Sequence, residues 1–86
     1  MMTNLNNKII DWHICKFPKA DKWDVYSKLL EEIGELSEAM ARSIDKNIEL
    51  EFGDVMMCMI ALSNQLQINI EDAVKQSHKK NLMRQV

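Results

Sequence analysis

The sequence contains few of the residues that mark turns or cross-links: two glycines, one proline and two cysteines in 86 residues. So few glycines and prolines argue against a sheet of many short strands, because such strands need turn residues at their ends. The cysteines show no CxxC or other zinc-type spacing, which argues against a structural zinc site. They fit a cytoplasmic protein with reduced thiols.

Long apolar runs and an excess of positive charge are also missing. No stretch reaches the roughly 20 apolar residues of a membrane-spanning helix, and the polar first residues do not resemble a secretion signal. The net charge of −2 does not supply the basic surface with which proteins bind nucleic acid. The sequence therefore predicts a cytoplasmic protein with neither a membrane nor a nucleic-acid partner.

Apolar residues, by contrast, make up 47% of the chain, and seven of them are methionine. That share is too high for a disordered chain, whereas a chain of this length buries only a modest core by itself. We therefore predict a single all-α domain over residues 1–86 that shares its excess apolar surface with a partner subunit.

Apolar spacing and helix signals place the first two helices. The first covers about residues 4–15 and stops at Phe17-Pro18, because proline cannot continue a helix. The second runs from Asp21, a favourable N-cap residue, to about Ser43, and carries an apolar stripe at helical spacing. The stripe consists of Leu29, Ile33, Leu36, Met40 and Ile44.

A polar break at residues 45–47 precedes the third helix, predicted for about residues 48–65. Its central run, residues 55–62, is apolar on every side, as in the centre of a bundle or in a subunit interface. A buried strand would also fit eight apolar residues, but the polar flanks without turn residues favour a helix. The fourth helix extends from Asn69, as N-cap, to about Leu82. Because the break is short, the second and third helices should form an antiparallel hairpin.

Two acidic pairs with a spacing of three residues lie on this hairpin: Glu32 with Glu35, and Glu51 with Asp54. Residues at i and i+3 share a helix face, and pairing the helices about their turn brings both pairs to a similar level. Carboxylates about 6 Å apart repel by roughly 3 kcal/mol at an effective dielectric near 20, unless a cation lies between them. Oxygen-only ligands favour Mg²⁺, with Mn²⁺ as a substitute. The alternative is a solvated acidic helix face, although both pairs flank apolar residues.

Each acidic pair encloses a glycine, Gly34 in the first and Gly53 in the second. Inside a helix, glycine costs about 1 kcal/mol relative to alanine. We interpret the glycines, Gly53 above all, as a sign that another group closely approaches the backbone.

Residues 31–36 and 51–55 resemble the EExxE and ExxD motifs of the MazG-type nucleoside triphosphate pyrophosphohydrolases, an all-α superfamily. Residues 12–18 are similar to the start of short MazG-like proteins, and the ending from Ala73 to Arg84 is similar to theirs. EExxE alone is common. Both motifs in this order, with a helical hairpin between them, are fairly specific.

The resemblance implies Mg²⁺-dependent hydrolysis of a (d)NTP between its α- and β-phosphates, which releases (d)NMP and pyrophosphate and cleans the nucleotide pool. The implied catalytic residues are Glu31, Glu32 and Glu35. Of these, Glu31 would be an auxiliary acid or would orient the attacking water. The implied metal ligands are Glu32, Glu35, Glu51 and Asp54.

Substrate contacts and assembly follow from the same resemblance. Lys28, Lys79 and Arg84 are candidates for the phosphates, and Asn81 for the sugar or base. The alternative for Lys79 and Arg84 is a solvated helix end that compensates the helix dipole. Trp12 and His13 are candidates for the base, although aromatic residues at a bundle end are more often core. Short family members assemble as homodimers or homotetramers, so we expect a four-helix chain that oligomerises into a helical bundle. A neighbouring subunit would then complete the pocket.

Two other functions are alternatives to the enzyme. One is a non-catalytic oligomeric helical module that binds nucleotide or a protein partner. The other is a di-iron carboxylate bundle, which needs Glu-x-x-His pairs. Neither His13 nor His78 has a glutamate three residues before it, so we set the di-iron bundle aside.

Overall fold

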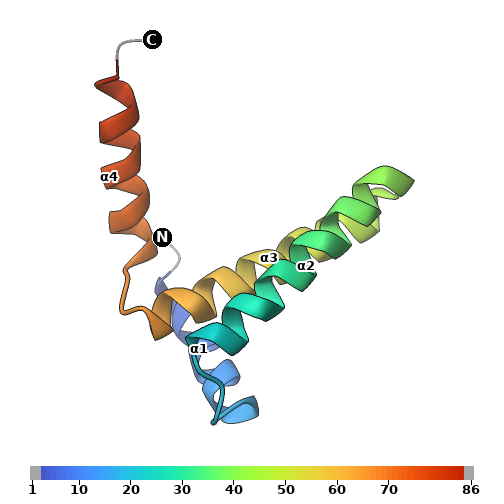
Figure 1. Ribbon diagram of the computed structural model, residues 1–86, viewed down its shortest axis with the longest axis horizontal. Coiled ribbons are helices and arrows are strands. Elements are labelled where there is room, and N and C mark those ends of the chain that lie inside the picture. The colour runs from blue at the N-terminus through green and yellow to red at the C-terminus, as the bar shows by residue number, and fades with distance from the viewer. Residues whose placement is uncertain (1–2, 85–86) are drawn as a thin grey trace.

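The computed structural model describes residues 3–84, which form four α-helices and no strand (Figure 1). The helices are α1 (Thr3–Lys16), α2 (Lys22–Arg42), α3 (Asp45–Gln65) and α4 (Ile70–Leu82). The prediction of an all-α chain with four helices is confirmed, and the apolar run 55–62 lies inside α3 rather than in a strand. None of the helices described has the length and hydropathy needed to cross a bilayer.

Side-chain caps define the starts of α2 and α4, as the sequence predicts. The Asp21 carboxylate accepts a hydrogen bond from the Asp24 N–H, and the Asp24 carboxylate accepts one from the Asp21 N–H, both at 2.9 Å. This reciprocal capping box satisfies two N–H groups at the start of the helix. The Asn69 side chain likewise accepts from the Asp72 N–H at 3.0 Å.

The third helix begins three residues earlier than predicted, because residues 45–47 form its first turn instead of a break. Only Ser43 and Ile44 connect it to α2. Ser43 has the left-handed conformation (φ 58°, ψ 35°), and its N–H donates to the carbonyls of Ala39 and Met40. The reversal is thus made by a serine in a conformation that glycine or asparagine usually adopts at helix ends.

The α2 and α3 helices lie side by side, and α1 packs against α3 near the beginning of α2 (Figure 1). Buried apolar side chains fill the space between them, and a single charged residue, Glu32, is buried among the described residues. The buried apolar residues are Val25, Leu29 and Ala39 of α2, and Ile60 and Ala61 of α3.

The apolar stripe predicted for α2 is divided between two surfaces. Leu29 is buried and Leu36 is half-buried, but Ile33, Met40 and Ile44 are 42%, 59% and 49% exposed. The line that α2 buries combines Leu29 and Leu36 with Val25, Glu32 and Ala39. Both sets have the 3.6-residue period, so periodicity does not distinguish the face that packs within the chain from the face left exposed.

This chain alone exposes more surface than a compact monomer of its mass. Its accessible surface is 7093 Å², whereas about 5,200 Å² is typical at this mass. Its radius of gyration is 14.7 Å, against about 12 Å for a compact domain of this length. The α4 helix projects away from the other three and buries none of its residues (Figure 1).

The capping box yields a stability prediction. Asp21→Ala should lower the free energy of unfolding by about 1 kcal/mol, because it leaves the Asp24 N–H without its acceptor. Asp21→Asn, which keeps an acceptor oxygen, should stay within a few tenths of a kcal/mol of wild type. Urea denaturation followed by circular dichroism measures both. Equal stability of the alanine variant and wild type would contradict the assignment.

Candidate active site

Three carboxylates meet where α2 and α3 lie side by side. Glu32 and Glu35, on successive turns of α2, and Glu51 of α3 each offer one oxygen, and these oxygens lie within 4.8 Å of one another. Oxygen ligands bind Mg²⁺ at about 2.1 Å, so small side-chain adjustments would let all three reach one ion. The local cause is the i, i+3 spacing on α2, which directs both of its side chains towards α3.

Two oxygens of this cluster are buried and have no hydrogen-bond partner. They are Oε2 of Glu32, a residue only 7% exposed, and Oε2 of the half-buried Glu51. A buried carboxylate oxygen without a donor is strongly destabilising, more so than a neutral polar atom. The donor set contains oxygen only, which suits a hard divalent cation such as Mg²⁺. The cluster therefore differs from a solvated acidic face.

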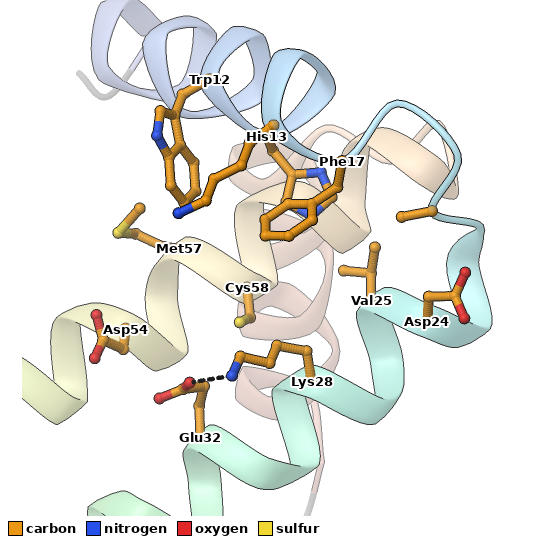
Figure 2. A pocket seen from close by; sticks show the side chains of 12 residues that line it. Trp12, His13, Phe17, Asp24, Val25, Lys28, Glu32, Asp54, Met57 and Cys58 are labelled. Atoms are coloured by element: carbon orange, nitrogen blue, oxygen red, sulfur yellow. Dashed lines mark ion pairs between the residues drawn. The ribbon is translucent and has the colours of Figure 1, made fainter.

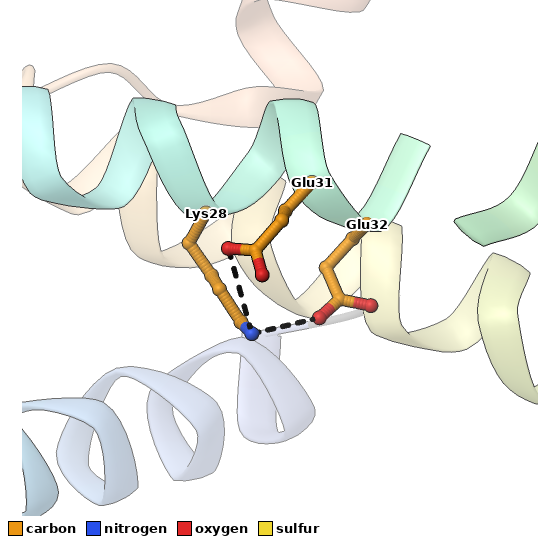
Figure 3. A network of polar contacts seen from close by, with 3 residues as sticks. All are labelled: Lys28, Glu31 and Glu32. Carbon is orange, nitrogen blue, oxygen red and sulfur yellow. Dashed lines mark ion pairs between the residues drawn. The ribbon is translucent and has the colours of Figure 1, made fainter. Parts of the chain in front are cut away.

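The other oxygen of Glu32 has a partner in Lys28, one turn earlier on α2. The Lys28 ammonium lies 3.2 Å from Glu32 Oε1 and 3.9 Å from Glu31 Oε2 (Figure 3). The hydrogen bond to Glu32, followed by the charge of Glu31, raises the pKa of Lys28 above its ordinary value. Lys28 thus neutralises Glu32 on one side and leaves Oε2 for another cation.

Repulsion between the carboxylates of the cluster changes the pKa of Glu35. The negative charge of Glu32, with further contributions that include the charge of Glu51, raises the pKa of the Glu35 carboxyl above its ordinary value of 4.5. A raised pKa means that the folded chain disfavours the ionised form of Glu35 in the absence of a cation.

A pocket of about 470 Å³ adjoins the cluster and is bounded by α1, α2, α3 and the α1–α2 connection (Figure 2). One end is aromatic. The rings of Trp12 and Phe17 meet edge to face with centroids 6.3 Å apart, and the centroid of the His13 ring lies 5.2 Å from that of Phe17. The other end carries the charged side chains of Lys28, Glu32 and Asp54 (Figure 2). A largely apolar pocket with a few polar groups is typical of a small-molecule site.

The remaining walls include the α1–α2 connection. Ala20 lines the pocket, and its carbonyl accepts a hydrogen bond from the Gln65 side chain at 3.0 Å, which ties the connection to the end of α3. The other lining residues are Lys16, Asp24, Val25, Met57 and Cys58.

The structure brings part of the predicted site together. Glu32, Glu35 and Glu51 form the cluster, while Asp54 lines the pocket beside it. Glu31 is exposed and contacts Lys28. The predicted base contacts, Trp12 and His13, line the pocket, as does Lys28.

The predicted substrate contacts on and after α4 lie elsewhere. Lys79, Asn81 and Arg84 are exposed, and none of them lines the pocket of their own chain. The reason is the direction of α4, which leaves the end of α3 away from the other helices (Figure 1). Within one chain, these three residues are not part of the site.

The close approach of another group that we expected at Gly34 and Gly53 is not found within the described part of this chain. A Cβ atom added to Gly34 or Gly53 would have no neighbour within 4 Å in the described part of the chain. Both glycines therefore have free space around them, and nothing among residues 3–84 requires their small size.

Several pocket residues were not anticipated from the sequence. Lys16 and Phe17 follow Trp12 and His13 by four residues each, the spacing that places side chains on one helix face. That signal would have found them. Cys58 carries no such signal; burial, followed by the charge of Glu32, raises the pKa of its thiol.

Comparison with known proteins adds one match. A family model described as the MazG nucleotide pyrophosphohydrolase domain matches residues 24–85, which include both acidic pairs. No curated protein and no solved structure matches the chain.

The repulsion at Glu35 predicts a trade-off between stability and metal binding. Glu35→Gln should raise the melting temperature of the metal-free protein at neutral pH, because it removes a charge that Glu32 and Glu51 repel. The same change should abolish or greatly reduce the further rise in melting temperature that saturating Mg²⁺ gives the wild type. Differential scanning fluorimetry with EDTA or Mg²⁺ measures both effects.

Glu38→Gln is the matched control, because Glu38 is on the same helix but pairs with Arg42 outside the cluster. It should not stabilise the metal-free protein, and it should keep the Mg²⁺ response. The rise in melting temperature that Glu35→Gln gives the metal-free protein should become smaller as the pH falls towards the raised pKa of Glu35. When the pKa of a carboxyl is raised by folding, its ionisation destabilises the fold. The free energy of unfolding therefore falls as the pH rises through that pKa, and protonation at lower pH removes this loss. A gain that does not depend on pH would contradict electrostatic repulsion as its cause.

Proposed function

Because the chain belongs to the MazG nucleotide pyrophosphohydrolase domain family, we propose that it is a Mg²⁺-dependent nucleoside triphosphate pyrophosphohydrolase. It cleaves a (d)NTP to the (d)NMP and pyrophosphate, and its role is to remove surplus or non-canonical nucleotides. The observation that carries this proposal is the pair of buried, unpartnered oxygens of Glu32 and Glu51 beside a pocket of nucleotide size.

In this proposal Glu32, Glu35 and Glu51 hold the ion, and Asp54, exposed at the rim of the pocket, completes the set from α3. Mg²⁺ at this position would supply charge neutralisation and Lewis acidity to the phosphates. The nearness of Glu32 to both Lys28 and the pocket supports placing the triphosphate at this end.

The surrounding side chains take the remaining roles. Lys28 orients Glu32 and offers a cation to the phosphates. Glu31 is exposed, and as an acid next to the ligand set it orients the attacking water and accepts its proton. Trp12 and His13 provide an aromatic wall for the base at the other end of the pocket.

Pyrophosphate release from a panel of dNTPs and NTPs, with Mg²⁺ or with EDTA, tests the activity. Glu35→Gln and Asp54→Asn should each reduce kcat/KM by about 100-fold or more, because each removes a charged ligand. Glu38→Gln should keep wild-type activity. Nucleotide binding without turnover by the wild type would contradict the enzyme and indicate a non-catalytic nucleotide-binding module.

We also propose that the chain forms a homodimer or homotetramer through its α2–α3 antiparallel hairpin. The exposed apolar side chains of Ile33 and Met40 on α2 and Phe52 on α3 support this, as does the large accessible surface. In such an assembly α4 can lie on a neighbouring subunit. The cations Lys79 and Arg84 and the amide of Asn81 would then reach the partner's pocket, although they are remote from their own.

Mixing two inactive variants tests this shared site. Glu35→Gln and Lys79→Gln homo-oligomers should each have low activity. After they are mixed, denatured and refolded together, about a quarter of wild-type activity should return, since mixed dimers contain one intact site. Lys75→Gln is the control on the same helix, because Lys75 pairs with Glu71 of its own chain. Failure of the mixture to exceed its components would show that Lys79 does not act at a partner's site.

A further inference from the structure

Lys16, the last residue of α1, lines the pocket without a carboxylate partner. Its ammonium lies 5.1 Å from the centroid of the Trp12 ring and 5.6 Å from that of Phe17. None of the ion pairs in the described part of the chain involves Lys16. The other pocket lysine, Lys28, is already held by Glu32. An anion that enters this pocket therefore meets Lys16 as a cation that no acidic side chain compensates.

The present contacts of Lys16 are weaker than those a phosphate would offer. A cation over aromatic rings at an exposed site gains little, whereas a charge-assisted hydrogen bond to a phosphate oxygen is among the stronger polar contacts. The lysine side chain is long and flexible, and its three donors can be redirected without backbone movement. Entry of a polyanion thus gives Lys16 a better partner than the rings.

We propose that Lys16 is a substrate-binding residue that leaves the faces of Trp12 and Phe17 when the nucleotide binds and contacts the triphosphate. The same movement exposes the two rings to the base. The inference rests on the proposed function, because it takes a nucleotide as the ligand of the pocket. It couples recognition of the phosphates to stacking of the base through one side chain.

A purely structural role for Lys16 makes different predictions. A lysine in the last turn of a helix interacts favourably with the helix dipole. If that were its only role, Lys16→Gln would lower the melting temperature slightly and leave the affinity for nucleotide unchanged. Binding affinity therefore separates the two roles.

The test measures binding without turnover. In a Trp23→Phe background, Trp12 is the only tryptophan and reports on the pocket. The probes, added with Mg²⁺, are the non-hydrolysable α,β-imido analogues of the four dNTPs, the corresponding nucleosides, and inorganic tripolyphosphate. The variants are Lys16→Gln, Lys16→Arg and Lys19→Gln; the last removes a charge from the same segment at an exposed position outside the pocket.

Lys16→Gln should raise the Kd of the best-bound analogue and of tripolyphosphate about tenfold or more, as expected for a lost charged hydrogen bond. The Kd of the nucleoside should stay unchanged or fall. Lys16→Arg should restore most of the affinity, and Lys19→Gln should match the background protein. Unchanged affinity in Lys16→Gln, an equal loss in Lys19→Gln, or no binding of any analogue to the background protein would overturn the proposal.

Pyrophosphate release by the same variants separates this inference from the proposed function. If analogues bind through Lys16 but no dNTP is cleaved, the enzyme proposal fails and the role of Lys16 stands. If dNTPs are cleaved and Lys16→Gln leaves KM unchanged, the role of Lys16 fails and the enzyme proposal stands.

Discussion

Glu32 occupies a position in α2 that helix packing would otherwise give to an apolar side chain, in the buried line between Leu29 and Leu36. The face that α2 turns towards α3 therefore carries a charge into the interior, where Glu51 offers a second. Two carboxylates less than 5 Å apart repel by roughly 3 kcal/mol at an effective dielectric near 20. That is a large part of the 5–15 kcal/mol by which small domains are stable. Lys28 relieves one side of Glu32, and a divalent cation would relieve the other.

The fold places this charge where a ligand can reach it. The α2 and α3 helices hold the carboxylates at fixed separations, and α1 closes the pocket from the side with its aromatic end. Because α2 and α3 use part of their apolar surface on each other, Ile33, Met40 and Phe52 stay exposed in one chain. An unstable charge cluster and an unpaired apolar surface are thus found together. In our proposal a metal ion neutralises the charge cluster, and a neighbouring subunit covers the apolar surface.

Local chemistry made most of the helices predictable from the sequence. Asp21 and Asn69 are cap residues with the expected hydrogen bonds, and Phe17-Pro18 marks the end of α1. The predicted position of the turn between α2 and α3 was wrong. Serine does not usually signal a left-handed helix end, and the polar residues 45–47 resemble a break although they form the first turn of α3. The i, i+3 spacing, with the helices paired about their turn, predicted that four carboxylates converge; Glu32, Glu35 and Glu51 lie within 4.8 Å of one another, without Asp54. The position of Asp54 beside the cluster, and the distance of α4 from it, depend on helix rotation and direction, which spacing does not determine.

The central claim is that Glu32 and Glu51 bury oxygens for a divalent cation. Crystals of the protein grown with Mn²⁺, a substitute for Mg²⁺ with usable anomalous scattering, test it most directly. Our account predicts an anomalous peak between α2 and α3, within about 2.2 Å of an oxygen of Glu32 and of Glu51. An empty cluster at saturating Mn²⁺, with Lys28 still the sole partner of Glu32, would contradict it.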